Sequence, residues 1–259
     1  MRQEYEQYSC LLSVTVKIIH AVLNLQLILG NINITVNIDD FTKGMGRLMK
    51  IRWFGHACFL FTSSKNTRVL TDPFDKKVGY ALPEVEADVV TTSHDHYDHN
   101  NIGIIGGKFE HIGTPGIYKK DDIEIKGIST FHDENEGAQR GENIVFKYDI
   151  DGVRLCHCGD IGHILTERQV KEIGEVDVLL LPVGGVYTVD SEGALKLMEQ
   201  LRPEVTIPMH FKTEALSFRL EGVEKFLARA GGEKLEKSEI EIRRENLAGF
   251  PKVLVLDYR

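Results

Sequence analysis

The sequence has few of the residues that mark secreted or nucleic-acid-binding proteins. Its 259 residues include four cysteines, seven prolines and one tryptophan. Four cysteines at irregular spacing form no disulfide framework in a chain of this length, which favours a reducing cytoplasm. Basic residues are also in the minority, because 31 lysines and arginines face 39 acidic residues for a formal net charge of −8. That charge gives no long-range attraction to nucleic acid or anionic lipid, so we expect neither as a partner.

The sequence also lacks a convincing membrane segment. Residues 10–30 are largely apolar, but Lys17 and His20 lie inside this run. Burying a lysine at the centre of a spanning helix costs about 2.5–3.5 kcal/mol. A signal peptide would need a basic start, whereas the first nine residues carry one arginine against two glutamates. We therefore expect no membrane association.

Residues 1–48 differ from the rest of the chain and form an N-terminal extension with two interpretations. One is an additional helix and strand packed on the following domain. The other is an over-extended start, with translation beginning at Met49. We favour the second, because Met49 is followed at once by the first strand of the domain, residues 49–259.

Short apolar runs separated by turn residues predict β-strands along the domain. The first three read as an antiparallel meander, and Asp151-Gly152 predicts a hairpin turn. Strands are expected at residues 50–54, 58–61, 68–71, 87–92, 123–131, 144–150, 153–158, 177–181, 205–208, 240–243 and 252–256.

Helices are expected only between these groups of strands. Thr166 and Gln169 form a Thr-x-x-Gln capping box, which predicts a helix start. Further helices are expected at residues 190–201 and 220–230. Strands in two groups, each followed by helices, favour a layered α/β sandwich over a single doubly wound sheet.

One segment is dense in residues that bind divalent metals. Residues 93–99 read Ser-His-Asp-His-Tyr-Asp-His directly after an apolar run. Imidazole and carboxylate groups are ligands that zinc, iron and manganese accept. In an extended segment His94, His96 and Asp98 would project to one side, and His99 could turn to a second position. The segment therefore predicts a site for two neighbouring metals, with Asp95 and Tyr97 pointing away.

Four further residues of ligand type share one context, the end of an apolar strand. They are His56, His132, Asp160 and His210. Strand ends present side chains to a shared edge in a layered fold, so we expect these residues to converge on a single site.

Together these residues resemble the five motifs of the metallo-β-lactamase superfamily. The segments that carry the resemblance are His-x-His-x-Asp-His at 94–99, His132, Gly159-Asp160 and Pro208-Met209-His210. The segments at 55–58, 72–74, 131–133 and 181–185 are further similar to the metal-dependent hydrolases close to ascorbate-6-phosphate lactonase. The resemblance covers about residues 50–215 and leaves residues 1–48 without a counterpart.

The resemblance implies a four-layer αββα sandwich with two divalent ions, zinc in the first place and manganese or iron as alternatives. The ions would share a hydroxide that attacks the substrate, and Asp98 would in addition orient it or accept its proton. The first ion would be held by His94, His96 and His132, and the second by Asp98, His99 and His210, with Asp160 bridging.

Other residues are candidates for contacts to the substrate or to the ligands. Those we single out are His56, His157, His163 and Lys212; the alternative for each is a hydrogen-bonded core residue or a solvated charge. His163 departs from the motif, since relatives carry threonine straight after the Gly-Asp pair. Asp72 caps a turn or supports a ligand.

Several groups near these motifs have a structural alternative. Cys156 and Cys158 share one face of a strand opposite His157, which favours buried thiols over a metal cluster. The charged loop after His132, with Glu134, Glu136 and Arg140, is a candidate substrate rim. Gly184-Gly185 and Tyr187 are candidates to line the pocket.

The sequence favours a metal-dependent hydrolase that uses a metal-bound hydroxide on an ester-like bond, a lactone or phosphoester, of a small molecule. No Gly-x-Ser-x-Gly nucleophile motif is present. One alternative is an iron-dependent redox enzyme, although flavin-linked relatives carry glutamate where this chain has His96. A second is a non-catalytic metal-binding sensor. The sequence does not decide between a monomer and a homo-oligomer.

Overall fold

Strand β1 (Met49–Gly55) opens the part of the chain that this computed structural model describes, residues 47–259. It pairs antiparallel with β2 (Cys58–Thr62), which pairs antiparallel with β3 (Arg68–Thr71), so the predicted meander is confirmed. The proposed N-terminal extension lies, up to residue 46, outside the described residues.

The first sheet has six strands in the order β13-β1-β2-β3-β4-β5. After the meander, β4 (Val89–Thr91) and β5 (Glu110–Ile112) run parallel to β3, and β13 (Glu239–Ile242) pairs antiparallel with β1. The second sheet also has six strands, in the order β11-β10-β9-β8-β7-β6. Its members are β6 (Gly116–Lys120), β7 (Ile123–Phe131), β8 (Glu142–Ile150), β9 (Val153–His157), β10 (Val178–Pro182) and β11 (Val205–Met209).

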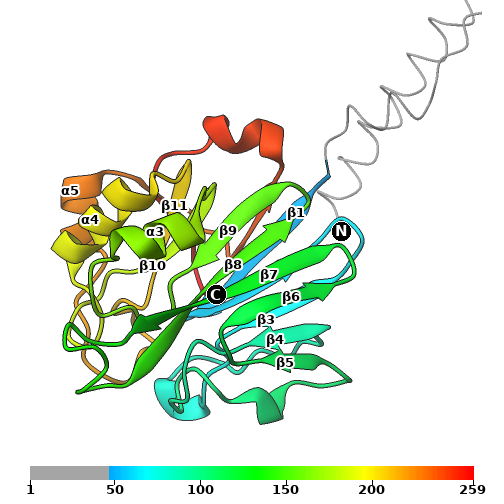
Figure 1. Cartoon of the computed structure of the whole chain (residues 1–259), viewed down its shortest axis with the longest axis horizontal. Helices are drawn as coiled ribbons and strands as arrows, with labels where there is room; N and C mark the ends of the chain where they lie inside the picture. Colours follow the sequence, from blue (N-terminus) through cyan, green and yellow to red (C-terminus); the bar gives the residue numbers. More distant parts are fainter. Residues whose placement is uncertain (1–46) are drawn as a thin grey trace, which may run out of the picture. The chain divides into compact units, whose positions relative to one another are not determined.

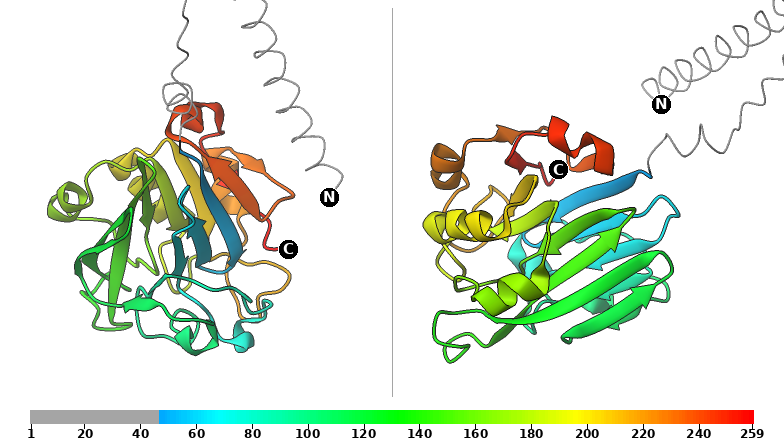
Figure 2. Two further views of the ribbon diagram at one scale, coloured as in Figure 1. Left: turned by 90° about the vertical axis from the view of Figure 1, so that its right-hand side faces the viewer. Right: turned by 45° about the horizontal axis from the view of Figure 1, so that its top comes forward.

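The two sheets pack face to face, as the edge-on view in Figure 2 shows. Alternation along the strands explains this packing, because successive side chains point to opposite faces. Phe59 and Phe61 join the large core cluster that contains residues of both sheets, whereas Cys58 and Leu70 join a smaller cluster. Strands β2 and β3 therefore bury both faces, one against the other sheet and one against the outer layer, whereas the outer face of β1 carries the exposed Arg52.

Helices α3 (Glu167–Ile173), α4 (Ser191–Leu201) and α5 (Glu224–Ala230) accompany the second sheet (Figure 1). The capping box of Thr166 and Gln169 is present at α3, and Asp190 caps α4. Helix α5 begins at Glu224, later than the predicted residue 220.

The outer layer on the first sheet is built differently. Here loops and the 3₁₀ helices η1 (Lys76–Val78) and η2 (Ile102–Ile104) supply the covering side chains, among them Phe74, Val78, Leu216 and Leu220. The predicted layered sandwich is confirmed, with a loop-rich layer on this side.

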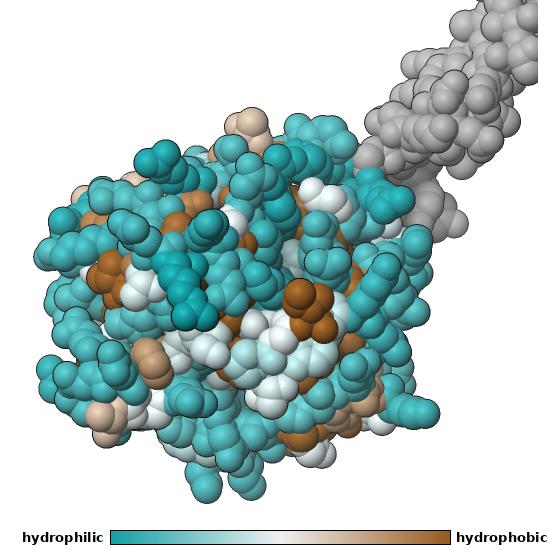
Figure 3. Space-filling model, in the orientation of Figure 1, coloured by the Kyte–Doolittle hydropathy of each residue, from teal (hydrophilic) through white to brown (hydrophobic). Residues whose placement is uncertain are grey.

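The remaining elements complete the C-terminal part of the chain. They are β12 (Glu233–Lys234), which pairs with β14 (Leu254–Val255), and the 3₁₀ helix η3 (Arg244–Gly249). None of the helices within residues 47–259 is long and apolar enough to cross a membrane. The face presented in Figure 3 is mainly hydrophilic, with small separated apolar patches.

Candidate metal centre

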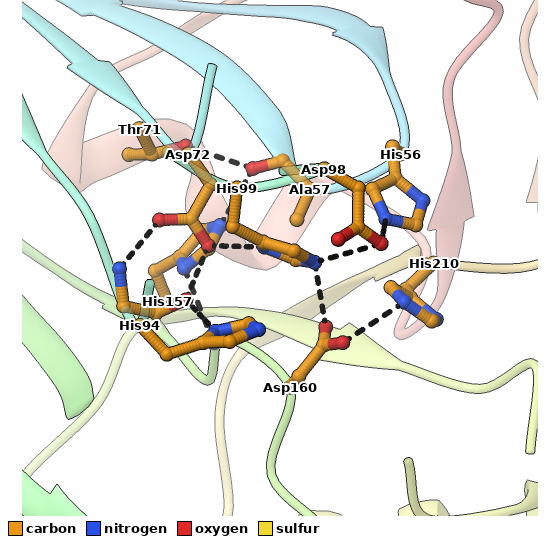
Figure 4. A network of polar contacts seen from close by, with 12 residues as sticks. His56, Ala57, Thr71, Asp72, His94, Asp98, His99, His157, Asp160 and His210 are labelled. Atoms are coloured by element: carbon orange, nitrogen blue, oxygen red, sulfur yellow. Dashed lines mark hydrogen bonds and ion pairs between the residues drawn. The ribbon is translucent and has the colours of Figure 1, made fainter. Parts of the chain in front are cut away.

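The ends of five strands bring the predicted ligands to one edge of the sandwich. His56 follows β1, His132 follows β7, Asp160 follows β9 and His210 follows β11, while the histidine-rich segment follows β4. Figure 4 shows the carboxylates and imidazoles of this cluster pointing toward one another. The expected convergence of these side chains is therefore confirmed.

The cluster divides into three overlapping groups whose potential ligand atoms lie within 4.8 Å of one another. Two of them match the predicted division of ligands, and the third links them through Asp160. The groups are His94, His96 and His132; His56, Asp98, His99 and His210; and His94, His99 and Asp160. The second group contains one residue more than predicted, His56.

The histidine-rich segment reaches this arrangement by turns and not by strand alternation. Strand β4 ends at Thr91, and residues 93–99 form bends and a turn. The backbone N–H groups of His99 and Asn100 both donate to the carbonyl of His96, each at 2.9 Å. The expectation of an extended segment is therefore wrong. Asp95 and Tyr97 are exposed and belong to none of the three groups, as predicted.

Asp160 occupies the middle of the cluster. Its Oδ1 lies 3.3 Å from Nε2 of His99, and its Oδ2 lies 3.2 Å from Nε2 of His132 and 3.1 Å from Nε2 of His210. Burial raises the pKa of Asp160, but His210 and His99 outweigh burial and hold the pKa well below its ordinary value. The carboxylate is therefore ionised and faces imidazoles of both predicted ligand sets.

The tautomers of two histidines follow from their partners beneath the centre. The carboxylate of Asp72 can only accept, so it receives hydrogen bonds from Ser93 Oγ (2.6 Å) and from His99 Nδ1 (2.9 Å). Having donated its proton, Ser93 Oγ accepts from His94 Nδ1 at 2.9 Å. The Nε2 lone pairs of His94 and His99 therefore point into the cluster. Neither Nε2 has a hydrogen-bond partner among residues 47–259.

These observations fit a divalent metal. Buried imidazole nitrogens with free lone pairs are costly unless a cation or donor meets them. Burial lowers the pKa of His99, but Asp160 and Asp72 outweigh burial and raise the pKa well above its ordinary value. Without a metal, the two carboxylates therefore favour a proton on Nε2 of His99. A bound cation would supply the same charge to the space between them.

His56 lies against the second group. It holds a left-handed backbone conformation (φ 52°), and its carbonyl accepts from Trp53 Nε1 at 3.1 Å and from the His210 backbone N–H at 3.2 Å. Its Nε2 lies 3.2 Å from Oδ2 of Asp98. Burial, with His210 nearby, lowers the pKa of His56 to about 4. Its position lines the site, as expected.

His157 lies beneath the centre and supports it. The ring is buried, Nε2 donates to the carbonyl of Ala57 at 2.8 Å, and Nδ1 accepts from the Gly159 N–H at 3.2 Å. It thus ties the β1–β2 turn, which carries His56, to the loop that carries Asp160. His157 is thus a buried, hydrogen-bonded histidine whose partners are backbone atoms next to His56 and Asp160.

Two predicted substrate contacts lie elsewhere. His163 Nε2 accepts from the Phe131 N–H at 3.2 Å and its Nδ1 donates to the Ile164 carbonyl at 2.8 Å, so both ring nitrogens are bonded to backbone. Lys212 is exposed, and its ammonium donates to the carbonyls of Leu216 and Phe218. His163 belongs to no ligand group, and the polar side-chain atoms of both residues are bonded to backbone.

Asn143 is a positioning residue that the sequence does not reveal. Its Oδ1 accepts from the Asp160 backbone N–H at 2.9 Å, and its Nδ2 donates to Thr130 Oγ1 at 2.7 Å and to the Cys158 carbonyl at 3.0 Å. The side chain is buried with all these bonds made. It fixes the backbone from which Asp160 projects.

Two glycines allow loops to lie directly on the backbone of ligands. A Cβ atom at Gly162 would stand 2.3 Å from the carbonyl carbon of His132, and one at Gly184 would stand 2.2 Å from the carbonyl oxygen of His210. Any side chain there would displace a ligand. The close packing explains the glycines at both positions.

The described cysteines take no part in the centre. Cys58, Cys156 and Cys158 are free, buried and absent from the ligand groups. A hydrogen bond with Cys156, and burial, raise the pKa of Cys158 well above its ordinary value. The prediction of buried thiols is confirmed.

The comparison with known proteins agrees with this geometry. A family model described as the β-lactamase superfamily domain matches residues 50–210. The chain belongs to the metallo-β-lactamase superfamily. Within it, the chain is 31% identical over 191 residues to the UPF0173 metal-dependent hydrolase of Thermoplasma acidophilum and 32% identical over 197 residues to that of Archaeoglobus fulgidus. Each match covers 64% of this chain and 84% of the relative.

A solved structure supports the same assignment. The protein from Thermotoga maritima, described as a candidate Zn-dependent hydrolase of the metallo-β-lactamase superfamily, is 41% identical with a TM-score of 0.67. The match covers 80% of this chain and 98% of that one. The chain is thus a metal-dependent hydrolase of the UPF0173 family. The similarity to ascorbate-6-phosphate lactonase is not among these findings.

Proposed function

We propose that this metallo-β-lactamase superfamily member holds two divalent ions, zinc in the first place, and hydrolyses an ester-like bond in a small molecule, either a lactone or a phosphoester. One ligand set is His94, His96 and His132, and the other is Asp98, His99 and His210, with Asp160 between them. The observation that carries the proposal is the position of the Asp160 carboxylate, within 3.3 Å of imidazole nitrogens from both sets.

Two neighbouring divalent ions, when bound, lower the pKa of a water molecule toward neutrality and polarise the carbonyl or phosphoryl oxygen of a substrate. The protein's own contribution is to hold the ligands in place. Asp72 and Ser93 fix the tautomers of His94 and His99, and Asn143 fixes Asp160. Such supporting contacts keep the ligand geometry ready before substrate arrives.

Asp98 is the proposed proton acceptor. Its side chain is 14% exposed, whereas the other members of its group are almost completely buried, so it faces the open side of the centre. Burial raises the pKa of Asp98, but the hydrogen bond with His56 and the neighbouring His99 outweigh burial and lower the pKa below its ordinary value. An ionised carboxylate at this position can orient a water molecule and take its proton.

Hydrolysis is favoured over the alternatives by the family itself. The UPF0173 relatives are named as metal-dependent hydrolases, and a redox enzyme or a sensor has no comparable support here. Turnover by the zinc-loaded protein without oxygen separates hydrolysis from iron-dependent redox chemistry, because hydrolysis changes no oxidation state.

The experiment is a screen of lactones and phosphoesters with wild type, Asp98→Ala and Asp95→Ala. Asp95 is a matched control, since it lies in the same loop but in no ligand group. We expect Asp98→Ala to lose about 10²- to 10⁴-fold in kcat, the range for a proton-transfer group, with an unchanged circular dichroism spectrum. Asp95→Ala should keep most of the activity. Full activity of a correctly folded Asp98→Ala protein would reject the proposed role.

A further inference from the structure

Two cavities open beside the ligands His94, His96 and His132 and share one residue. The first, of about 510 Å³, is lined by His132, by the cations Arg140 and Lys196, and by the carboxylates Asp133, Glu134, Asp190 and Glu192. Asp133 and Asp190 accept hydrogen bonds from backbone N–H groups. The second, of about 490 Å³, is lined by His94 and His96. Arg140 lines both. A group bound to its side chain would therefore lie beside the first set of ligands, His94, His96 and His132.

The guanidinium of Arg140 is available for a ligand. Within residues 47–259 no carboxylate forms an ion pair with it, and its one hydrogen bond runs from Nη2 to the Val186 carbonyl at 3.3 Å. A guanidinium has five N–H donors, so most remain free. The other cation of the first cavity, Lys196, is already paired with Glu192 at 3.2 Å.

The loop that carries Arg140 is rigidly held against the metal ligands. The Asp133 carboxylate accepts hydrogen bonds from four backbone N–H groups of the loop, at 2.7–3.0 Å; these belong to Asn135, Gly137, Gln139 and Arg140. At the end of the loop, the Gly141 carbonyl accepts from the His132 N–H at 3.0 Å. Arg140 is thus fixed relative to His132, which lowers the entropy lost when a ligand binds.

A strained turn completes the surroundings of Arg140. Val186 holds a left-handed backbone conformation (φ 66°), which is unfavourable for a β-branched residue. This turn directs the Val186 carbonyl to Arg140 and places the exposed Tyr187 ring 5.9 Å from its guanidinium carbon. The strain therefore serves to orient the arginine and gives it an aromatic wall.

We propose that Arg140, covered by Tyr187, is a subsite for an anionic oxygen group, phosphate or carboxylate, on the substrate of the metal centre. Arginine suits this task because its planar fork binds such groups through two parallel hydrogen bonds. The inference rests on the proposed hydrolytic function and narrows its substrates to anionic esters, lactones or phosphoesters. Neutral esters of equal size are poorer substrates.

Paired substrates test the subsite in the metal-loaded full chain. These are para-nitrophenyl hydrogen succinate, para-nitrophenyl phosphate and the neutral para-nitrophenyl butyrate. For Arg140→Gln we expect kcat/KM on one or both anionic substrates to fall about ten- to a hundredfold, as for a lost charged hydrogen bond, mainly through KM. The neutral ester should be unaffected.

Two variants make this test specific. Arg140→Lys should recover part of the loss, because it keeps the charge but not the fork. Arg168→Gln, which removes an exposed arginine outside both cavities, should behave as wild type. Loss confined to the succinate ester identifies a carboxylate, and loss confined to the phosphate identifies a phosphoryl group. Equal loss on the neutral ester, or no loss on either anion, overturns the inference.

Calorimetry separates this inference from the hydrolytic proposal. Succinate and inorganic phosphate are titrated into metal-loaded wild type and Arg140→Gln. We expect at least one anion to bind about tenfold more weakly to the variant. That result with no ester hydrolysed by wild type would leave the subsite standing and reject the hydrolytic proposal. Equal affinities of both proteins, or no binding by wild type, would reject the subsite.

Discussion

Asp72 Oδ2 accepts a hydrogen bond of 2.9 Å from Nδ1 of His99, and both side chains are completely buried beneath the metal centre. The same carboxylate accepts from the backbone N–H of Ser93 at 2.7 Å and from its hydroxyl at 2.6 Å. Burial raises the pKa of Asp72, but His99 outweighs burial and lowers the pKa below its ordinary value. The end of β3 thus sets the orientation of two ligands that follow β4.

Removing this support should weaken metal binding without removing a ligand. In Asp72→Ala the His99 ring loses its fixed tautomer, and we expect metal affinity to fall about 10- to 100-fold, as for other contacts that orient ligands. Competition with a chelating dye measures the change, and Asp149→Asn, at an exposed carboxylate on β8, is the control. Unchanged affinity in a folded Asp72→Ala protein would show that His99 needs no such support.

Asn143 should contribute to both stability and the position of Asp160. Asn143→Ala leaves the Asp160 N–H without its buried acceptor, so we expect the free energy of unfolding to fall by about 2–3 kcal/mol. Urea denaturation checks this value. Asn143→Asp keeps the acceptor but loses the two donated bonds, and its loss should be smaller unless the added carboxylate repels Asp160. No change in Asn143→Ala would contradict the assigned role.

His163 should contribute to the stability of the protein and not to its rate of turnover. His163→Ala removes its two bonds with the backbone at Phe131 and Ile164, and we expect the free energy of unfolding to fall by about 1 kcal/mol. Because both ring nitrogens are occupied, kcat/KM should stay near the wild-type value. A large loss of activity at unchanged stability would restore His163 as a substrate contact.

A second buried carboxylate, away from the metal centre, predicts a pH dependence of stability. Asp177 accepts from Arg154 Nε at 2.9 Å and Nη2 at 2.7 Å, and it also pairs with Arg244. Burial raises its pKa, but the hydrogen bonds from Arg154 and Arg244 outweigh burial and lower the pKa below its ordinary value. The unfolded chain therefore takes up this proton first as the pH falls.

The contribution of Asp177 is thus complete above its unfolded pKa of about 3.9 and is lost as the pH falls through the lower folded value. At neutral pH we expect the free energy of unfolding of Asp177→Asn to be about 1–3 kcal/mol lower than that of wild type. The difference should shrink below about pH 4. Urea titrations at both pH values measure it, and a constant difference would argue against an ionised Asp177.

Local sequence patterns were sufficient for part of the fold. Strand β7 occupies the range that its apolar residues predict, and Asp151 and Gly152 both take the positive φ of the predicted hairpin turn. Strands β5 and β6 were not predicted, because they are short, partly exposed edge strands that depend on pairing with a neighbour. Helix α5 starts late because Glu221 bonds to the backbone of Gly184, far along the chain.

The site, like the fold, could be predicted only in part. The metal ligands could be predicted because few structural roles need so many imidazoles and carboxylates at strand ends. The residues that hold the ligands in place could not be predicted. His157 bonds to Ala57, 100 residues away, and Asn143 resembles any polar strand residue in sequence. Alternation also failed at residues 93–99, where a turn replaces the extended segment. Contacts distant in sequence decide these features.

The number of metal ions bound per chain tests the central claim most directly. Metal analysis is made on wild type and on His132→Ala and His210→Ala, which each remove a ligand from one proposed set. The account predicts two divalent ions per wild-type chain, about one per chain in each variant, and hydrolysis only where both ions are bound. A single ion in wild type, or unchanged metal content in both variants, would contradict it.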